Sequence, residues 1–361
     1  MLFSFFLISS LVILIDIMCF FLFRNKAHNN IDVDNLPTIS VLVAVRNEEN
    51  NILACLESLN HLNYPQDKLQ ILIGNDLSTD KTAQIVENFI HGKPKFQLIH
   101  ISENIGKAVG KANVLAQLAH KATGEWLFFT DADITHQPDW LQNMLACGHT
   151  KDLITGFTWI KNNTLQAIEW TFTLGVAKIF SDFQLPTTAM GNNMAIKKEM
   201  YLKTGGYENL SSSIVEDFAL LQAVIEQKGN FTNVVEKAVK AYSEPTTSFL
   251  TLLQQRKRWM KGAIKAPWYA KAYIFIRVMF ILSLLSVFFT NPEQWQIILG
   301  IWSMKIIFQS IFILLLFRKV KEKILWIYLV VYEIYTNLLT LVLITYYLLP
   351  FQVFWKGRKY T

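Results

Sequence analysis

Three groups of carboxylates in this chain have the spacing of chemical sites. Asp131-Ala132-Asp133 ends an apolar run that begins at Trp126, so two acids leave a buried strand separated by one small residue. Asp76 follows another apolar run, and Glu216-Asp217 precedes an amphipathic segment. Carboxylate oxygens suit a hard cation such as Mg²⁺ or Mn²⁺, and a single carboxylate can serve as a general base. Taken alone, Asp131-Ala132-Asp133 is equally explained as a turn or a helix cap, and for Asp76 and Glu216-Asp217 a cap is the commoner explanation.

Basic and aromatic residues accompany these acids. Lys107 follows a glycine at the start of a predicted helix, where the ammonium and the helix dipole favour phosphate, although a solvated lysine is the commoner outcome. Gln255, Arg258 and Trp259 stand just before an apolar region. Arg258 could neutralise a diphosphate and Trp259 could stack on a sugar, but such residues also anchor helices at a membrane surface.

The elements expected to position these residues alternate between strand and helix. Apolar runs predict strands at 38–45, 69–73, 96–101 and 125–130, with helical spacing between them. This βαβαβαβ order predicts a doubly wound α/β sheet that binds ligands at the carboxyl ends of its strands. The candidate residues at those ends are Arg46, Asn47, Glu48, Asp76, Lys107, Asp131 and Asp133. Their common placement favours a shared site over unrelated caps.

The composition indicates a membrane protein. Of the 361 residues, 52% are hydrophobic and 17% charged, with a mean hydropathy of +0.27. Residues 2–23 are long enough to span a membrane, and they lack the basic start and cleavage site of a signal peptide. We therefore predict an N-terminal anchor at 1–28, an α/β domain at 29–245, interfacial helices at 246–271, and a C-terminal region at 272–361 with two or three spans.

Basic residues predict the topology but leave one conflict. Arg24 and Lys26 follow the first span, and 318–323 precedes the last, which favours a cytoplasmic α/β domain. Three C-terminal spans would place the basic residues of 356–359 outside, against the same rule. Either one stretch, such as the one that contains Arg277, lies along the interface, or the tail breaks the rule.

The charge and the cysteines narrow the class of protein. The net charge of +6 comes from basic residues beside membrane segments, which favours lipid headgroups and diphosphates over nucleic acid. Cys19, Cys55 and Cys147 have no metal or disulfide spacing and are expected to be reduced. Asp16, inside the first span, is a functional candidate or the partner of a polar group on another span.

In order along residues 38–262, these motifs resemble those of the membrane-bound family 2 glycosyltransferases, which include polysaccharide synthases and ceramide-type lipid glucosyltransferases. Gln255–Trp259 fits the Gln-x-x-Arg-Trp signature of that group. The chain departs from the synthases at Val215, where they usually carry Thr, and at Asn75, where Asp is more common. The resemblance implies a GT-A fold, a Rossmann-like nucleotide-diphospho-sugar transferase domain, between N- and C-terminal transmembrane helices.

The resemblance also implies roles for the residues. It makes Asp217, beside Glu216, the catalytic base, and assigns a divalent metal (Mg or Mn) to Asp133 and Asp131. It assigns the nucleotide-sugar to Arg46, Asn47, Glu48, Asp76, Lys107, Asp131, Gln255, Arg258 and Trp259. It assigns the acceptor to Gly191, Asn193 and Trp259.

The expected activity is inverting transfer from a nucleotide-sugar, most simply a UDP-sugar, to a lipid or lipid-linked glycan in the bacterial inner (cell) membrane, as part of cell envelope glycan or glycolipid biosynthesis. A processive polysaccharide synthase with the same site is the alternative, and a non-enzymatic membrane scaffold is a remote one. A haloacid-dehalogenase phosphatase is disfavoured because its first motif opens the domain, whereas three βα units precede Asp131 here. The oligomeric state is left open.

Overall fold

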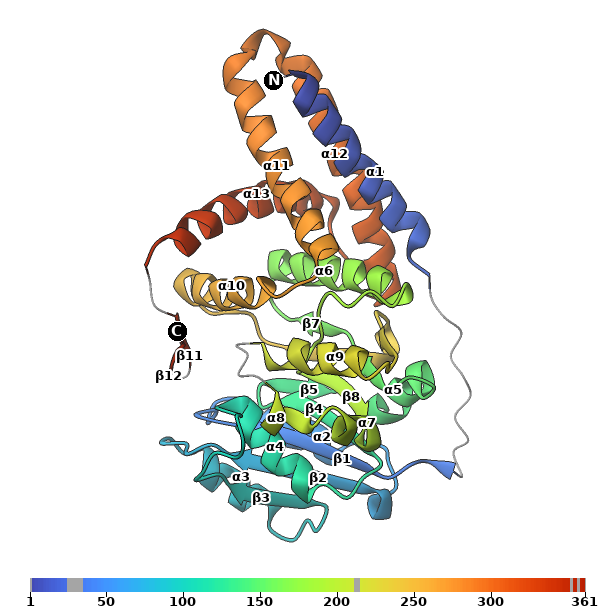
Figure 1. The fold of residues 1–361 in the computed structure, drawn as a ribbon, viewed down its shortest axis with the longest axis vertical. Helices are drawn as coiled ribbons and strands as arrows, with labels where there is room; N and C mark the ends of the chain where they lie inside the picture. The colour runs from blue at the N-terminus through green and yellow to red at the C-terminus, as the bar shows by residue number, and fades with distance from the viewer. Residues whose placement is uncertain (1, 25–34, 211–214, 351–352, 356–357, 361) are drawn as a thin grey trace.

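The α/β domain lies at one end of the molecule and the long apolar helices at the other (Figure 1). The computed structural model describes residues 2–24, 35–210, 215–350, 353–355 and 358–360. Lys26, Lys356 and the predicted boundary between residues 28 and 29 lie outside the described residues.

The main sheet has seven strands in the order β3-β2-β1-β4-β8-β6-β9. They are β1 (Ile39–Val45), β2 (Leu69–Asn75), β3 (Phe96–His100), β4 (Trp126–Asp131), β6 (Leu153–Thr155), β8 (Asn193–Lys197) and β9 (Phe231–Asn233). Strands β1 to β4 are the four predicted ones, and they pair in parallel. Strand β8 runs antiparallel to β4 and β6, so the sheet is mixed beyond β4.

Helices cover both faces of this sheet because side chains alternate along its strands. Val41, Val43 and the apolar residues of α2 (Ile52–Asn60) and α3 (Thr82–Ile90) form one core. Leu42, Leu72 and the apolar residues of α4 (Lys111–Lys121) and α9 (Glu216–Glu226) form the other. Both cores support strands whose carboxyl ends share one edge, as the alternation predicted.

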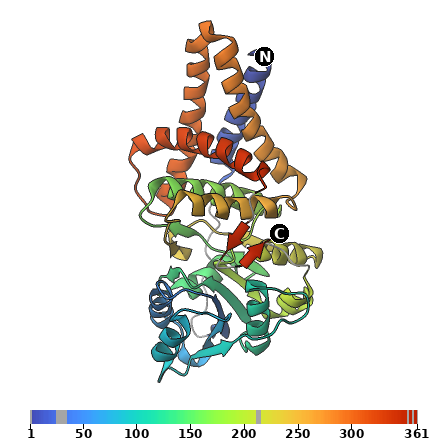
Figure 2. The ribbon, with the colours of Figure 1, turned by 90° about the vertical axis from the view of Figure 1, so that its left-hand side faces the viewer.

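A small second sheet, with strand order β5-β10-β7, lies next to the main one. Its strands are β5 (Ile134–His136), β7 (Thr158–Ile160) and β10 (Ala241–Ser243). The remaining helices of the domain are α5 (Trp140–Gly148), α6 (Thr164–Asp182), α7 (Lys198–Lys203), α8 (Gly206–Asn209) and α10 (Phe249–Ala263). Helices α6 and α10 separate the sheets from the apolar helices (Figures 1 and 2).

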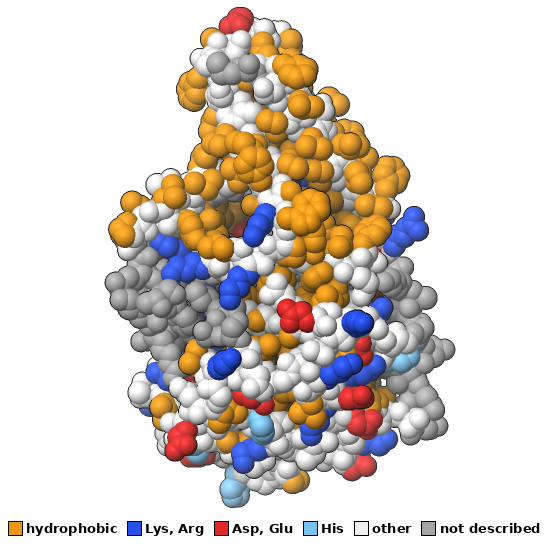
Figure 3. All heavy atoms as spheres, viewed as in Figure 1, with side chains coloured by type: hydrophobic (Ala, Val, Ile, Leu, Met, Phe, Trp, Pro, Cys, Tyr) orange, Lys and Arg blue, Asp and Glu red, His pale blue; other side chains and the backbone are white. Residues whose placement is uncertain are grey.

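Within the described residues, four helices are long and apolar enough to cross a membrane. They are α1 (Leu2–Leu22), α11 (Trp268–Thr290), α12 (Trp295–Lys319) and α13 (Trp326–Leu348). Helices α1, α11 and α12 stand upright together, whereas α13 lies across the top of α6 and α10 in both ribbon views (Figures 1 and 2). Arg277 belongs to upright α11, so the stretch lying across is not the one that the sequence suggested. The apolar helices form the hydrophobic upper surface in Figure 3.

Charged residues inside this helical region are paired. The Arg277 guanidinium donates to the Asp16 carboxylate, which joins α11 to α1. Lys305 of α12 donates to Glu333 of α13 and to the Gln309 side chain. Paired charges are the usual form in which ionisable residues are tolerated among apolar helices. Asp16 therefore has a structural partner on another helix, one of the two roles expected for it.

Candidate active site

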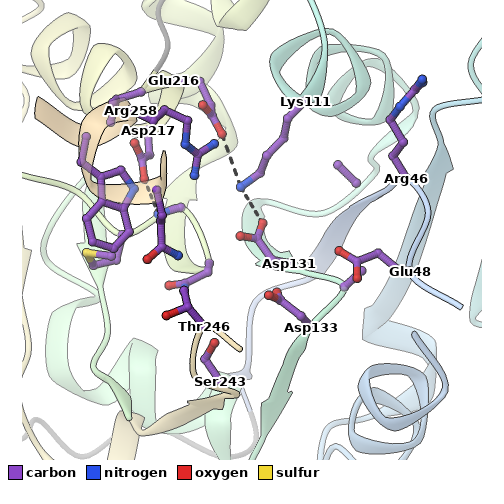
Figure 4. A pocket seen from close by; sticks show the side chains of 18 of the residues that line it. Arg46, Glu48, Lys111, Asp131, Asp133, Glu216, Asp217, Ser243, Thr246 and Arg258 are labelled. Atoms are coloured by element: carbon purple, nitrogen blue, oxygen red, sulfur yellow. Dashed lines mark hydrogen bonds and ion pairs between the residues drawn. The ribbon is translucent and has the colours of Figure 1, made fainter. Parts of the chain in front are cut away.

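A cavity of about 210 Å³ opens where the carboxyl ends of the parallel strands meet α6, α9 and α10 (Figure 4). The predicted site residues that line it are Arg46, Glu48, Asp76, Asp131, Asp133, Gly191, Glu216, Asp217, Gln255, Arg258 and Trp259. Residues separated by more than 200 positions in the sequence thus meet around one space. Asn47, Lys107 and Asn193 were also predicted and do not line it.

Lys111 is the lysine that the structure places in this cavity. Its Nζ lies 2.5 Å from Asp131 Oδ1 and 3.3 Å from Glu216 Oε1, so one ammonium joins the two acidic motifs (Figure 4). Burial opposes its charge, but Asp131 and Glu216 outweigh burial and raise the pKa of Lys111. The side chain is therefore held as a cation in the centre of the site.

Lys107 lies elsewhere because the helix begins later than predicted. Gly110 has φ of 59° and directly precedes α4, so Lys111, not Lys107, is the first helical residue. The backbone N–H of Lys107 donates to the Glu208 carbonyl at 2.7 Å. A signal for Lys111 was present, since Gly110-Lys111 is a second Gly-Lys pair four residues after the first.

Asp131 and Asp133 face the cavity from the end of β4. Burial, reinforced by the negative charge of Asp131, raises the pKa of Asp133 to about 6. A nearby cation would stabilise the ionised form of such a carboxylate, and oxygen ligands suit Mg²⁺ or Mn²⁺. No group of three or more His, Cys, Asp or Glu with metal-binding geometry occurs among the described residues. Asp131 and Asp133 would therefore be the residues of this cavity that hold such a cation.

Asp217 is fixed by two backbone donors at the start of α9. The Gly191 N–H donates to its Oδ2 and the Phe218 N–H to its Oδ1, each at 2.8 Å. Burial, together with the charge of Glu216, raises the pKa of Asp217 to about 6. A carboxylate held this firmly, with a pKa near neutrality, has the properties of a general base.

Gly191 packs closely against Asp217. A Cβ added at Gly191 would lie 3.0 Å from the Asp217 Cβ and 3.1 Å from its Oδ2. The glycine therefore lets its own backbone N–H approach the carboxylate, and it orients the base.

Two tryptophans form the wall that faces the apolar helices. Trp170 of α6 and Trp259 of α10 line the cavity with their ring centroids 4.9 Å apart. The Arg256 guanidinium stacks 4.2 Å from the Trp259 ring and forms two hydrogen bonds of 2.9 Å with the Glu169 carboxylate. This pairing fixes α10 against α6 and holds Trp259 in place.

Trp170 was not predicted from the sequence. Its indole Nε1 is buried and has no hydrogen-bond partner among the residues that the structure describes, which leaves a donor at the cavity wall. No local motif marks it, because a tryptophan within an apolar helix is ordinarily a packing residue. The tertiary fold brings it to the cavity wall, where its ring lies beside that of Trp259.

Arg46, Asn47 and Asn193 form hydrogen bonds that hold segments around the cavity. Asn47, with φ of 51°, accepts from the Thr79 N–H at 2.9 Å and so links the loops after β1 and β2. Arg46 Nη1 donates to the Asp76 carbonyl at 2.6 Å. The Asn193 side chain is buried and accepts from Trp140 Nε1 at 2.9 Å, while its neighbour Asn192 lines the cavity.

Comparisons with known proteins agree with this geometry. Residues 126–355 match the family described as Glycosyl transferase family group 2, and residues 40–203 match Glycosyl transferase family 2. The chain is 27% identical over 248 residues to Probable glycosyltransferase YdaM of Bacillus subtilis, covering 64% of this chain and 56% of that protein. It is 27% identical over 238 residues to Beta-monoglucosyldiacylglycerol synthase of Nostoc, and the match covers 63% of this chain and 49% of that protein.

The fold also has a solved counterpart. Mannosyltransferase PcManGT from Pyrobaculum calidifontis, solved with GDP-Man and Mn²⁺, superposes with a TM-score of 0.64 at 18% identity, covering 86% of this chain and 95% of that one. At that identity the likeness shows the GT-A fold. The chain spans about half the length of the curated relatives that it matches.

Proposed function

Since the chain belongs to glycosyl transferase family group 2 and is a membrane-type glycosyltransferase, we propose that it transfers one sugar from a nucleotide-sugar to a lipid of the membrane in which it is embedded. The observation that carries this proposal is the make-up of the cavity. Acids from the strand ends and Lys111 from the start of α4 form one side, and Trp170 and Trp259 from the helices beneath the membrane region form the other.

The strand-end side suits the donor. Arg46 and Asp76 lie at the carboxyl ends of β1 and β2, where α/β sheets bind nucleotides. Lys111 and Arg258 would bring positive charge to the diphosphate, which stabilises it as it leaves. Asp131 and Asp133 would hold the divalent cation, which supplies further neutralisation of the leaving diphosphate when bound.

Asp217 supplies the base. An acceptor hydroxyl attacks the anomeric carbon, its proton passes to a carboxylate oxygen of Asp217, and the bond from that carbon to the diphosphate breaks. The cavity contains Asp217 as a base fixed by backbone N–H groups, while Asp131 and Glu216 are engaged by Lys111. Direct attack by the acceptor with Asp217 as the base corresponds to a single displacement with inversion.

The tryptophan side suits a lipid acceptor. Helices α6 and α10 line the cavity and also contact α13, while α6 contacts α12 as well, so an acceptor headgroup reaches the base without leaving the membrane surface. The relative named Beta-monoglucosyldiacylglycerol synthase supports a diacylglycerol-type lipid. We also propose that the protein works in the bacterial cell membrane with the α/β domain in the cytoplasm, where nucleotide-sugars are made.

The test is a donor and product screen. Membranes containing the protein are incubated with labelled UDP-Glc, UDP-Gal, UDP-GlcNAc or GDP-Man, with Mg²⁺ or Mn²⁺, or with EDTA. We expect label from one donor in the organic-soluble fraction, and none after EDTA. Label in an aqueous polymer would instead indicate a processive synthase. No transfer from any nucleotide-sugar would contradict the proposal.

A further inference from the structure

We propose that α13 lies in the plane of the membrane surface on the side of the α/β domain, with one face in the lipid leaflet, and does not cross the bilayer. Composition alone gives the opposite expectation, because α13 is one of the four helices apolar enough to span. Its 23 residues have a length of about 34 Å at roughly 1.5 Å per residue, enough for a hydrocarbon core of about 30 Å. The inference depends on where its two ends lie.

The start of α13 is tied to the α/β domain. Glu322, four residues before the helix, accepts from Lys240 Nζ at 2.5 Å, and the Val320 carbonyl accepts from the same ammonium at 3.2 Å. Lys240 is buried and directly precedes strand β10 of the domain. The segment that enters α13 is therefore held against the second sheet.

The end of α13 is tied to the same domain. Lys257 of α10 donates to the carbonyls of Tyr346 and Leu349, at 2.9 and 2.8 Å. These are carbonyls of the last helical turn and just beyond it, which a lysine is suited to cap. The next residue along α10 is Arg258, which lines the cavity. A helix with both ends beside one domain cannot cross to the other side of a bilayer.

The face of α13 toward the domain is packed along its length. Leu329 and Tyr332 are buried in the core that contains Phe172 of α6. Farther along, Leu339 is buried against Leu252 and Leu253 of α10. The contacts follow one stripe at helical spacing, so α13 rests on α6 and α10 from end to end, as Figures 1 and 2 show.

The opposite face of α13 is apolar and exposed. Its large apolar side chains at intervals of three or four positions include Ile327, Val331, Ile334, Leu338 and Val342, with Leu338 59% exposed. This stripe continues the apolar surface of the upright helices, which form the upper region of Figure 3. A lipid leaflet covers all of these surfaces together if α13 lies at the headgroup–acyl boundary, as amphipathic interfacial helices do.

The same placement removes the conflict between the basic residues near the C-terminus and the positive-inside rule. With α1, α11 and α12 upright and α13 in plane, the chain after α13 returns to the side of the α/β domain. The hairpin strand β11 (Val353–Trp355) contacts α10, and β12 (Arg358–Tyr360) pairs with it. Arg358 and Lys359 then lie on the same side as the basic residues at 318–323, in agreement with the positive-inside rule.

The test compares the sides on which two parts of the full-length protein lie. An epitope tag is added after Thr361, and sealed inverted vesicles are treated with protease. We expect the tag and the α/β domain to be digested in the same vesicles, and both to be protected in right-side-out vesicles. A control variant with the tag between Asn291 and Pro292, in the α11–α12 connection, should show the reverse pattern.

The result that would overturn the proposal is a C-terminal tag protected wherever the α/β domain is digested. Digestion of the domain is itself the internal reference, so the outcome can be interpreted even if the control insertion disturbs its turn. The assay measures sidedness and needs no enzymatic activity, so it is independent of the proposed transfer reaction.

Discussion

The Lys111 ammonium lies 2.5 Å from a carboxylate oxygen of Asp131. This ion pair joins the start of α4 to the end of β4 inside the cavity, where both side chains are about two-thirds buried. It places a fixed positive charge beside Asp131 and Asp133, the acids proposed to hold a divalent cation, and close to the proposed position of the diphosphate. We therefore propose that Lys111 has the role at the diphosphate that the family resemblance assigned to Lys107.

We predict that Lys111→Met impairs donor use while Lys107→Met does not. Loss of a charge aimed at the leaving diphosphate should lower kcat/KM for the nucleotide-sugar by about 10- to 100-fold. Lys107 does not line the cavity, so its variant should stay within about threefold of wild type. Steady-state kinetics on the two variants test this prediction. Equal losses of kcat/KM in both would contradict the proposal that Lys111, and not Lys107, acts on the diphosphate.

The pKa of Asp217, raised to about 6, predicts an acidic limit to activity. The base must be ionised to accept the hydroxyl proton, and Asp133, whose pKa is also raised to about 6, must be ionised to hold a cation, so log kcat/KM should be level well above pH 6 and fall below it by about one to two units per pH unit. Rates measured from pH 4.5 to 8 test this. A flat profile across pH 5 to 7 would rule out a base with this pKa.

Trp170→Phe should act on the acceptor and not on the donor. The change keeps an aromatic surface and removes the buried indole N–H, which has no partner within the described residues. Loss of one such hydrogen bond to an acceptor oxygen corresponds to a rise in acceptor KM of about 3- to 10-fold. Trp268→Phe is the matched control, since Trp268 is 79% exposed. An unchanged acceptor KM in Trp170→Phe would remove this residue from the acceptor site.

Asp16→Asn should destabilise the helical bundle without touching the cavity. It leaves Arg277 without its buried counter-ion, a loss of about 3 kcal/mol for a pair of this kind. We expect a lower Tm in detergent, with partial recovery in the double variant Asp16→Asn, Arg277→Gln. If the double variant had a lower Tm than the single one, loss of the ion pair would not explain the destabilisation.

Most of the α/β half of the molecule was predictable from local pattern. The runs that form β1 to β4 are largely apolar, and acids stand at the ends of β2 and β4, so placing the strands also placed Asp76, Asp131 and Asp133. For Asp217 the strand pattern gave no position, and only the motif identified it. Its place in the cavity depends on the contact with Gly191, which is distant in sequence.

The remaining features depend on contacts distant in sequence. Trp170 lies at the cavity wall beside Trp259, where Arg256 and Glu169 join α10 to α6 across 87 positions of sequence. The orientation of α13 is hidden from hydropathy, since an in-plane helix on an apolar support and a spanning helix have the same composition. It follows from Lys240 and Lys257, which hold its two ends.

The most direct test of the central claim is the transfer rate of Asp217→Asn, measured together with nucleotide affinity. The amide keeps the shape of the side chain and cannot take the acceptor proton, so transfer to lipid should fall by about 100- to 10,000-fold. Nucleotide affinity should stay within about threefold of wild type, because Asp217 is proposed to act on the acceptor hydroxyl and not on the nucleotide. Near-normal turnover of Asp217→Asn would contradict the account of this site.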